Sequence, residues 1–212
     1  HRFFIICFPN LKKAIINDIN EDLINTYKTI ASNPNELISI LEILQNEFHS
    51  LEWDAKKIYY NRKRELYNAR KEVLSVQAAL FIFLNRTCFN GLYRVNSKNE
   101  FNVPMGGYKR PTICNRKDIL SVSEALQKVE FLCGDFEKTL CQTKEKSLFY
   151  FDPPYKPLDD TPRFNSYTKE GFDNEEQIRL RDFCKRIDAE GHRWILSNSD
   201  VRCVDINNNF FD

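Results

Sequence analysis

A carboxylate, two prolines and an aromatic ring follow an apolar run in the segment FYFDPPYKPL, residues 149–158. Pro153 and Pro154 have no backbone N–H and a fixed φ, so a strand cannot continue through them. Pro153 also favours an extended conformation at Asp152. The segment therefore predicts a rigid corner at the carboxyl end of a strand, which is where open α/β sheets bind ligands. This corner would offer a ligand one carboxylate, proline carbonyl groups and the ring of Tyr155.

Two further acids, Asp18 and Asp135, also end apolar runs. In nucleotide-binding α/β folds an acid at a strand end commonly binds a ribose, because a carboxylate can accept from two vicinal hydroxyl groups. Gly134 precedes Asp135 and would let a ligand approach the backbone closely. A structural interpretation stays open for each acid, since Asp18 could cap a helix and Asp135 could close a turn. Three acids at three strand ends nevertheless favour a ligand cleft.

Positive charge is concentrated in one segment of a nearly neutral chain. Residues 85–117 contain seven Lys and Arg against one acid, Glu100, a net charge of +6. The whole chain has a net charge of +1, so the remainder carries −5. A basic segment rich in Asn and Gly on an otherwise acidic chain predicts a polyanionic partner. A solvated loop without a partner is the alternative.

Composition narrows the class of protein. The 212 residues are 42% hydrophobic and 13% aromatic, which suits one large domain or a core domain with a smaller insertion. No apolar stretch approaches the roughly 20 residues that span a bilayer. The seven cysteines form no CxxC pair and there are three histidines, so we predict no metal site. Scattered cysteines indicate reduced thiols and a cytoplasmic location.

Apolar runs and helical periods alternate at both ends of the chain. The pattern predicts strands at 12–20, 128–136, 147–152 and 193–199, and helices after an Asn20 N-cap and at 34–48, 54–85, 117–127 and 173–191. This alternation predicts an α/β fold with a mostly parallel sheet. The helical and loop-rich part between the strands indicates a smaller domain inserted into the α/β domain. We expect a discontinuous catalytic domain, 1–49 and 116–212, with an inserted domain at 50–115.

Several of these motifs together resemble the Dam-type DNA adenine-N6 methyltransferases. The resemblance rests on DPPY after an apolar strand, on NDIN at 17–20, and on RTCFNGLYRVNSKNEFNVPMGGYKRP at 86–111. NSYTKEGF at 165–172 and LSNSD at 196–200 are also similar to later segments of the family. The resemblance covers nearly the whole chain, in the family's alpha-type order. It implies a Rossmann-like sheet of the S-adenosylmethionine-dependent methyltransferase type, with an inserted, mainly helical target-recognition domain that binds double-stranded DNA.

The resemblance assigns the catalytic motif to Asp152, Pro153, Pro154 and Tyr155. The amine of adenine is a poor nucleophile because its lone pair is delocalised into the ring. The Asp152 carboxylate and the Pro153 carbonyl would accept its two N–H groups and so stabilise the positive charge that develops on nitrogen. Tyr155 would stack on the base, which must leave the duplex to be reached.

The resemblance also assigns the residues that would bind S-adenosylmethionine, the methyl donor. Asp18 would bind the cofactor ribose. Asp135 would line the adenine pocket, with Phe136 as a ring wall. Asp152 would lie against both the cofactor and the target base.

The target-reading positions of the family match residues of the basic segment. Arg94 would read guanine, since its guanidinium matches two acceptors on the major-groove edge. Lys109 and Arg110 would contact phosphates, which position the protein without specifying sequence. The implied site is GATC. The matching positions are Asn90, Leu92, Arg94 and Pro104, with Tyr108 inserting near the extruded base.

The chain departs from the family pattern at its ends. No glycine-rich loop of the FxGxG kind precedes NDIN, and no closing hairpin follows NNNFFD. We therefore expect a chain truncated at both ends, which binds S-adenosylmethionine more weakly than a chain with the glycine loop.

Two alternatives to an active DNA adenine methyltransferase stay open. One is a catalytically inactive remnant that at most binds DNA. The other is a DPPY enzyme that acts on RNA or on cytosine N4, which the match of residues 86–111 disfavours. We expect a monomer, and a restriction endonuclease counterpart is a further candidate partner.

Overall fold

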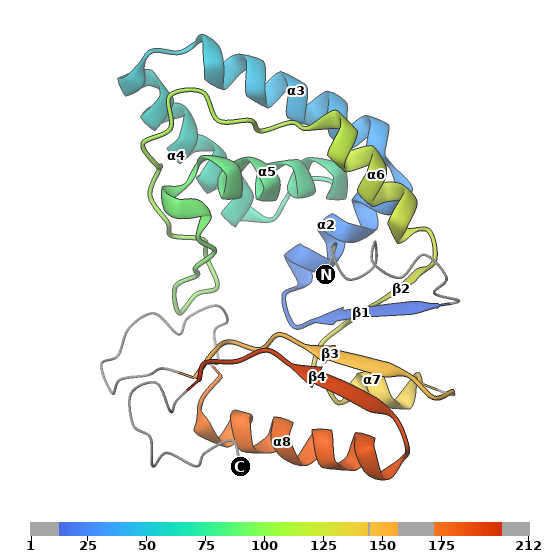
Figure 1. Cartoon of the computed structure of the whole chain (residues 1–212). Helices are drawn as coiled ribbons and strands as arrows, with labels where there is room; N and C mark the ends of the chain where they lie inside the picture. Colours follow the sequence, from blue (N-terminus) through green and yellow to red (C-terminus); the bar gives the residue numbers. More distant parts are fainter. Residues whose placement is uncertain (1–12, 144, 157–171, 201–212) are drawn as a thin grey trace. The chain divides into compact units, whose positions relative to one another are not determined.

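The computed structural model describes residues 13–143, 145–156 and 172–200 (Figure 1). Contacts between residues divide the chain into two compact units. The first unit comprises His1–Arg94 and Glu100–Phe136, and the second comprises Val95–Asn99 and Glu137–Asp212. Each unit has its own pair of parallel strands and its own helices.

In the first unit, the strands β1 (Ala14–Asp18) and β2 (Val129–Cys133) pair in parallel. Their register aligns Asp18, the last residue of β1, with Cys133, the last residue of β2. Both strands lie within predicted ranges, and their parallel pairing confirms that part of the prediction. The two carboxyl ends therefore lie at the same edge of this small sheet.

The helix α2 (Glu21–Ser32) begins directly after β1, as the sequence predicts. The Asn20 side chain caps it by accepting from the backbone N–H of Leu23 at 3.1 Å. Glu21 and Asp22 stand in the first turn, where negative charge complements the helix dipole. Local sequence thus defines how the chain leaves β1.

Helices form most of the first unit. They are α3 (Pro34–Ser50), α4 (Trp53–Ala69), α5 (Leu74–Thr87) and α6 (Arg116–Leu126). Pro34 occupies the first turn of α3, a position where its missing N–H is tolerated. The apolar faces of these helices and of α2 share one core, in which the largest fully buried side chains include Leu37, Leu41, Phe48, Tyr60, Tyr67, Phe83 and Leu84.

The predicted helical stretch 54–85 is two helices rather than one. Arg70 has a left-handed backbone with φ of 49°, and its N–H donates to the carbonyl of Tyr67, so α4 ends there. A left-handed residue cannot continue a right-handed helix. The chain therefore turns after Arg70, and α5 packs back against α2, α3 and α4.

In the second unit, the strands β3 (Leu148–Phe151) and β4 (Arg193–Leu196) pair in parallel, as predicted. The helix α8 (Asn174–Ala189) is capped by Asp173, which accepts from the backbone of Glu175 and Glu176. Phe183 of α8 packs its ring on the strand, with centroids 5.9 Å from Phe151. A short helix, α7 (Lys138–Cys141), was not predicted.

The prediction of an α/β fold is confirmed as a mixed α/β structure with short parallel strands. A continuous Rossmann-like sheet and an inserted domain at 50–115 stay predictions. Among the residues that the structure describes, no helix is long and apolar enough to cross a membrane.

Candidate functional site

The carboxyl ends of β1 and β2 form the first candidate region. The backbone N–H of Gly134 donates to the Asp18 carbonyl at 3.0 Å. The Asn17 side chain donates from Nδ2 to the carbonyls of Gly134 and Asp135, at 3.0 and 2.9 Å. These bonds bring together Asp18 and Asp135, two predicted cofactor residues that are 117 positions apart. Phe136 follows directly and is half-buried.

Asp18 carries a carboxylate that is partly removed from water. Its Oδ1 accepts from the backbone N–H of Asn20 at 2.8 Å. Burial raises the pKa of Asp18 above its usual value, and the backbone N–H groups of Asn20 and Ile19 partly offset this rise. A carboxylate in such a setting gains more from a new hydrogen-bond donor than one in bulk water.

Asn17 has an acceptor that is buried without a partner. Its Oδ1 makes no hydrogen bond to any part of the chain that the structure describes. A buried unsatisfied oxygen costs about 1–3 kcal/mol unless a donor reaches it. A ligand with hydroxyl or amine donors at this strand end would satisfy it. Sequence reasoning missed Asn17, although an amide inside the apolar run AIIND is an unusual feature.

The second unit contains the predicted catalytic corner. Asp152 follows β3 directly and is exposed, and Pro153 and Pro154 are half-buried. Tyr155 is 49% exposed, and its hydroxyl shares a hydrogen bond with Oγ of Ser197. The corner therefore presents both a carboxylate and an aromatic ring to solvent.

The recognition segment (residues 88–115) connects α5 to α6. Its first residue, Cys88, pairs with Met105 in an antiparallel bridge, so residues 88–105 form a closed loop. The N–H of Phe89 donates to the Pro104 carbonyl at 2.9 Å, and the N–H of Gly106 donates to Thr87 at 2.8 Å. A Cβ on Gly106 would lie 2.7 Å from the Cys88 carbonyl oxygen and from the Tyr108 ring, so only glycine fits this close crossing.

One face of α4 holds the recognition segment by its backbone. Asn68 donates to the Phe101 carbonyl at 3.0 Å and accepts from the Phe101 N–H at 2.8 Å. The Tyr60 hydroxyl donates to the Val103 carbonyl at 2.8 Å. The Lys56 ammonium donates to the Lys109 carbonyl at 3.0 Å. Lys56, Tyr60 and Asn68 are separated by four and by eight residues, so they lie along one side of the helix.

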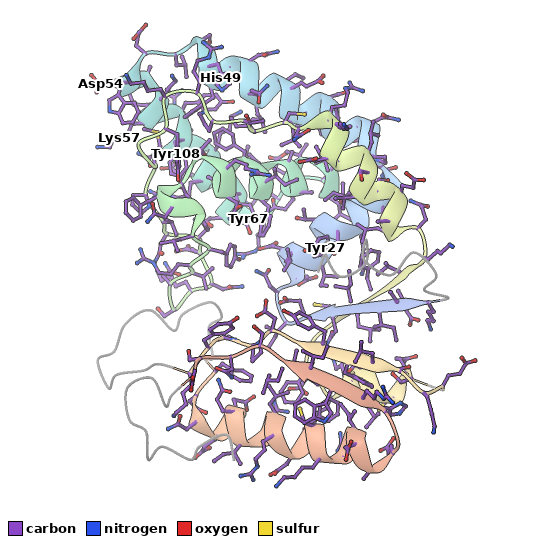
Figure 2. All side chains as sticks on the ribbon, viewed as in Figure 1. Tyr27, His49, Asp54, Lys57, Tyr67 and Tyr108 are labelled. Carbon is purple, nitrogen blue, oxygen red and sulfur yellow. The ribbon has the colours of Figure 1, made fainter. Side chains whose placement is uncertain are left out.

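The helix α3 continues this row of anchors. Nε2 of His49 donates to the carbonyl of Pro111 at 2.9 Å. Oε1 of Gln45 accepts from the backbone N–H groups of Ile113 and Cys114, at 2.9 and 3.1 Å. Figure 2 labels His49 and Tyr108 in this part of the first unit. These anchors engage the backbone of the segment, while its side chains Phe101, Val103 and Ile113 are buried in the core of the first unit.

Most of the predicted DNA-contacting side chains are exposed, unlike the buried side chains around them. Arg94 is half-buried, and its Nε donates to Oδ1 of Asn102 at 2.7 Å. Asn90 has a left-handed backbone with φ of 53°. The exposed members of the predicted set are Asn90, Leu92, Pro104, Tyr108, Lys109 and Arg110.

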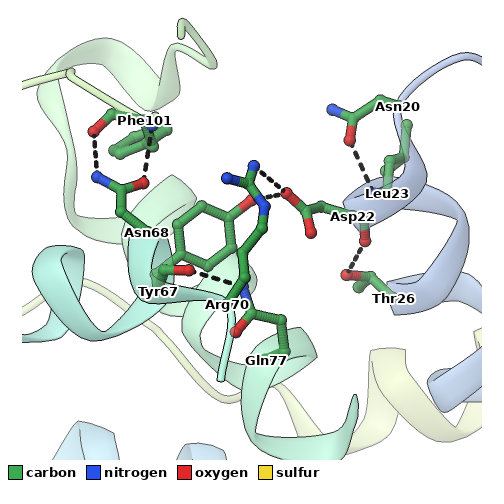
Figure 3. Close-up of polar contacts among 9 residues, drawn as sticks. All are labelled: Asn20, Asp22, Leu23, Thr26, Tyr67, Asn68, Arg70, Gln77 and Phe101. Atoms are coloured by element: carbon green, nitrogen blue, oxygen red, sulfur yellow. Dashed lines mark hydrogen bonds and ion pairs between the residues drawn. The ribbon is translucent and has the colours of Figure 1, made fainter. Parts of the chain in front are cut away.

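A partly buried polar cluster links α2 to the end of α4 (Figure 3). Oδ2 of Asp22 accepts from the Tyr67 hydroxyl at 2.7 Å and from Nη2 of Arg70 at 3.0 Å. Burial raises the pKa of Tyr67, and the neighbouring Tyr93 and Asp22 add to this rise. The cluster joins the helix that follows β1 to the helix that anchors the recognition segment.

Comparison with known proteins identifies the family. A model of the D12 class N6 adenine-specific DNA methyltransferases matches residues 2–212. The chain belongs to this family.

Several known proteins are similar to this chain over most of its length. The Type II methyltransferase M.MjaIII of Methanocaldococcus jannaschii is 46% identical, over 93% of this chain and 69% of that protein. M1.LlaDCHI of Lactococcus lactis subsp. cremoris, also named a Type II methyltransferase, is 43% identical over 89% of this chain and 66% of that protein. The DNA adenine methylase of Haemophilus influenzae is 36% identical over 91% of this chain and 66% of that protein. The chain spans about two thirds of the length of these relatives.

These matches confirm the resemblance to the Dam-type enzymes and the classification as a DNA adenine methyltransferase. The roles of individual residues stay predictions. In this D12 chain the predicted cofactor residues Asp18, Asp135 and Phe136 belong to the first unit, and Asp152 and Tyr155 belong to the second. Among the described residues no cluster of three or more His, Cys, Asp or Glu side chains could hold a metal ion.

Proposed function

We propose that this protein transfers the methyl group of S-adenosylmethionine to N6 of adenine in double-stranded DNA, within the sequence GATC. The observation that carries the proposal is the exposed Asp152 carboxylate at the end of β3, followed by two prolines and an exposed Tyr155. Membership of the adenine-specific family supports the choice of N6 of adenine.

The catalytic corner would act by accepting hydrogen bonds. The Asp152 carboxylate and the Pro153 carbonyl would each accept one N–H of the target amine. This directs the lone pair toward the methyl donor and stabilises charge that forms in the transition state. Rings fix φ at Pro153 and Pro154, so their carbonyls need little reorganisation when the reaction occurs. Tyr155 would stack on the extruded adenine.

S-adenosylmethionine, when bound, supplies an activated methyl group on a sulfonium for in-line displacement. The residues at the ends of β1 and β2 fit its adenosine part. The Asp18 carboxylate suits two ribose hydroxyls, and Asp135 with Phe136 suits the base. The buried, unpartnered Oδ1 of Asn17 also fits a ligand that brings hydrogen-bond donors.

The recognition segment would read the duplex. Arg94 would recognise guanine through its guanidinium, and Leu92 would contact a thymine methyl group. Lys109 and Arg110, both exposed, would contact phosphates. Asn90, Pro104 and Tyr108 complete the proposed contact surface. We also propose that the two parallel strand pairs belong to a Rossmann-like sheet with an inserted target-recognition domain at 50–115.

The names of two relatives as Type II methyltransferases support a restriction-modification setting, with an endonuclease counterpart. A cytoplasmic location and a monomeric state remain predictions.

A methyl-transfer assay tests the function directly. The protein is incubated with labelled S-adenosylmethionine and with duplexes that contain one GATC or the same bases in scrambled order. We expect label on N6 of adenine in GATC alone. Label on cytosine, on RNA or equally on scrambled duplexes would overturn the proposal.

The matched variants are Asp152→Ala and Asp188→Ala, which removes an exposed carboxylate of α8 in the same unit. Asp152→Ala should retain less than about a tenth of the rate, a loss of more than about 1.4 kcal/mol of transition-state stabilisation. Its DNA affinity should stay within about twofold, because the carboxylate acts on the amine and not on phosphates. Asp188→Ala should match the unaltered protein.

A further inference from the structure

Two amide side chains hold the backbone on both sides of Tyr155. Nε2 of Gln177 donates to the Pro154 carbonyl at 2.9 Å. Oδ1 of Asn198 accepts from the backbone N–H of Lys156 at 2.9 Å. The two amides are bonded to each other, since Nδ2 of Asn198 donates to Oε1 of Gln177 at 2.9 Å. The bonds form a continuous relay from Pro154 to Lys156 that passes around Tyr155.

The relay can form in one direction only. The Pro154 carbonyl accepts and cannot donate, so Gln177 must turn its NH₂ toward it. The Lys156 N–H donates and cannot accept, so Asn198 must turn its oxygen toward it. If either amide were flipped, two donors or two acceptors would face each other. Gln177 is 4% exposed, so water cannot readily replace these bonds.

The two amides come from different elements, so the relay connects α8 and the residues after β4 to the corner. We call this connection the brace. Gln177 lies in the first turn of α8, after the cap at Asp173. Asn198 follows β4, and its neighbour Ser197 shares a hydrogen bond with the Tyr155 hydroxyl. The Ser197 N–H also donates to the Phe151 carbonyl at 2.9 Å, which extends the strand pairing toward the corner. Tyr155 is thus held at the peptide before it, at the peptide after it and at its hydroxyl.

We propose that Gln177 and Asn198 are positioning residues, a coupled amide pair that sets the backbone of the catalytic corner and thereby aims the Tyr155 ring. The relay occupies the Pro154 carbonyl. The Pro153 carbonyl is then the one that accepts from the target amine. The catalytic consequence of this assignment rests on the proposed function. The brace itself is a property of the corner and is measured separately.

Isosteric variants test the pair. Gln177→Glu replaces the NH₂ that faces the Pro154 carbonyl with an oxygen. Asn198→Leu keeps the shape of the side chain and removes both the oxygen that accepts from Lys156 and the NH₂ that faces Gln177. Gln142→Glu makes the same chemical change as Gln177→Glu at an exposed glutamine of the same unit and is the control. Ser197→Ala is a milder variant that removes the partner of the Tyr155 hydroxyl and leaves the relay in place.

The first readout is hydrogen exchange at the Lys156 amide, which needs no activity. We expect exchange to become at least tenfold faster in Gln177→Glu and Asn198→Leu, while amides inside β3 and α8 keep their protection. Gln142→Glu should leave it unchanged. Unchanged exchange at Lys156 in both relay variants would overturn the proposal. Global loss of protection in both would do so too, because the pair would then serve general stability.

The second readout is catalysis by the protein on a GATC duplex. We expect kcat to fall about 10- to 100-fold in each relay variant, with KM for the duplex and the Kd for S-adenosylmethionine within about twofold. The double variant should be no slower than the worse single variant, because both break one relay. Ser197→Ala should lose less than tenfold.

The outcomes separate the two proposals. If the unaltered protein transfers no methyl group but the relay variants lose Lys156 protection, the proposed function fails and the brace stands. If the protein is active and both relay variants keep kcat within twofold, the positioning role fails and the proposed function stands.

Discussion

At the residue scale, Asp18 has two interpretations that a single substitution separates. Burial raises its pKa, so the ionised carboxylate destabilises the folded state at neutral pH. Asp18→Asn removes the charge and keeps an oxygen for the Asn20 N–H. We expect a melting temperature that is equal or a few degrees higher, at about 2–4 °C per kcal/mol for a chain of this size. S-adenosylmethionine should bind at least tenfold more weakly, since hydrogen bonds to a charged group contribute about 1.5–3 kcal/mol.

The pH dependence of stability provides a check on the same variant. A carboxyl whose folded pKa is raised contributes stability below its unfolded pKa and loses it as the pH rises through the folded value. The stability difference between Asp18→Asn and the unaltered protein should therefore shrink as the pH falls toward 3.8, the ordinary value. Calorimetry at several pH values measures it. A destabilised variant with unchanged cofactor affinity would show that Asp18 serves the helix start alone.

Arg94 and Lys109 should separate sequence reading from positioning on the duplex. Arg94→Ala should lower discrimination against a changed guanine by about 1–3 kcal/mol. Lys109→Ala should weaken all duplexes alike and reduce the salt dependence of binding, because a phosphate contact releases counterions. Binding titrations of GATC and altered duplexes at several salt concentrations measure both effects. Equal loss of selectivity in the two variants would contradict this division.

At the element scale, α4 acts as a template along which the recognition segment lies. Lys56 is 8% exposed, bonds the Lys109 carbonyl and lies 5.5 Å from the centre of the Phe48 ring. Its neighbour Lys57 is exposed and points away from this row (Figure 2). Two lysines adjacent in sequence therefore have opposite roles in the fold.

Methionine at each of these positions provides a matched test of the template. Lys56→Met keeps the apolar stem and loses the donor, so we expect a loss of about 1–2 kcal/mol of stability. The recognition segment should also lose part of its GATC discrimination. Lys57→Met should change stability by less than about 0.5 kcal/mol. Urea unfolding and duplex titrations measure both variants, and equal effects of the two substitutions would rule out the anchoring role of Lys56.

At the scale of the whole molecule, each unit contains a buried thiol whose titration should limit stability at alkaline pH. Burial raises the pKa of Cys88 in the first unit and of Cys184 in the second, each to about 11. A raised folded pKa means that the stability is fully present below 9.0 and is lost as the pH rises through about 11. The loss is on the order of 3 kcal/mol per thiol.

Urea unfolding at pH 8 and at pH 10.5 measures this effect. The double variant Cys88→Ala and Cys184→Ala should have a smaller difference in unfolding free energy between the two pH values than the unaltered protein. Cys141→Ala, which removes an exposed thiol, should leave that difference unchanged. If the double variant shows the same difference as the unaltered protein, the buried thiols do not govern alkaline stability.

Local features of this protein were predictable from the sequence because their causes are local. Asn20 caps α2 through the Leu23 N–H three residues away. The apolar runs became β1, β2, β3 and β4 because each run is long enough to form a strand and ends at polar or turn residues. The proline pair ends β3 because proline has no N–H for strand pairing. The same motifs identified the family.

Tertiary structure decided which side chains hold these motifs in place. Gln177 bonds a carbonyl 23 residues away and Lys56 bonds one 53 residues away. An isolated glutamine or lysine in a helix has no local pattern that distinguishes an anchor from a solvated side chain. The break at Arg70 was also missed, since arginine has no special preference for a left-handed backbone. The sequence by itself determined which residue types form the corner and where β3 ends, and packing between distant segments decided what supports the corner.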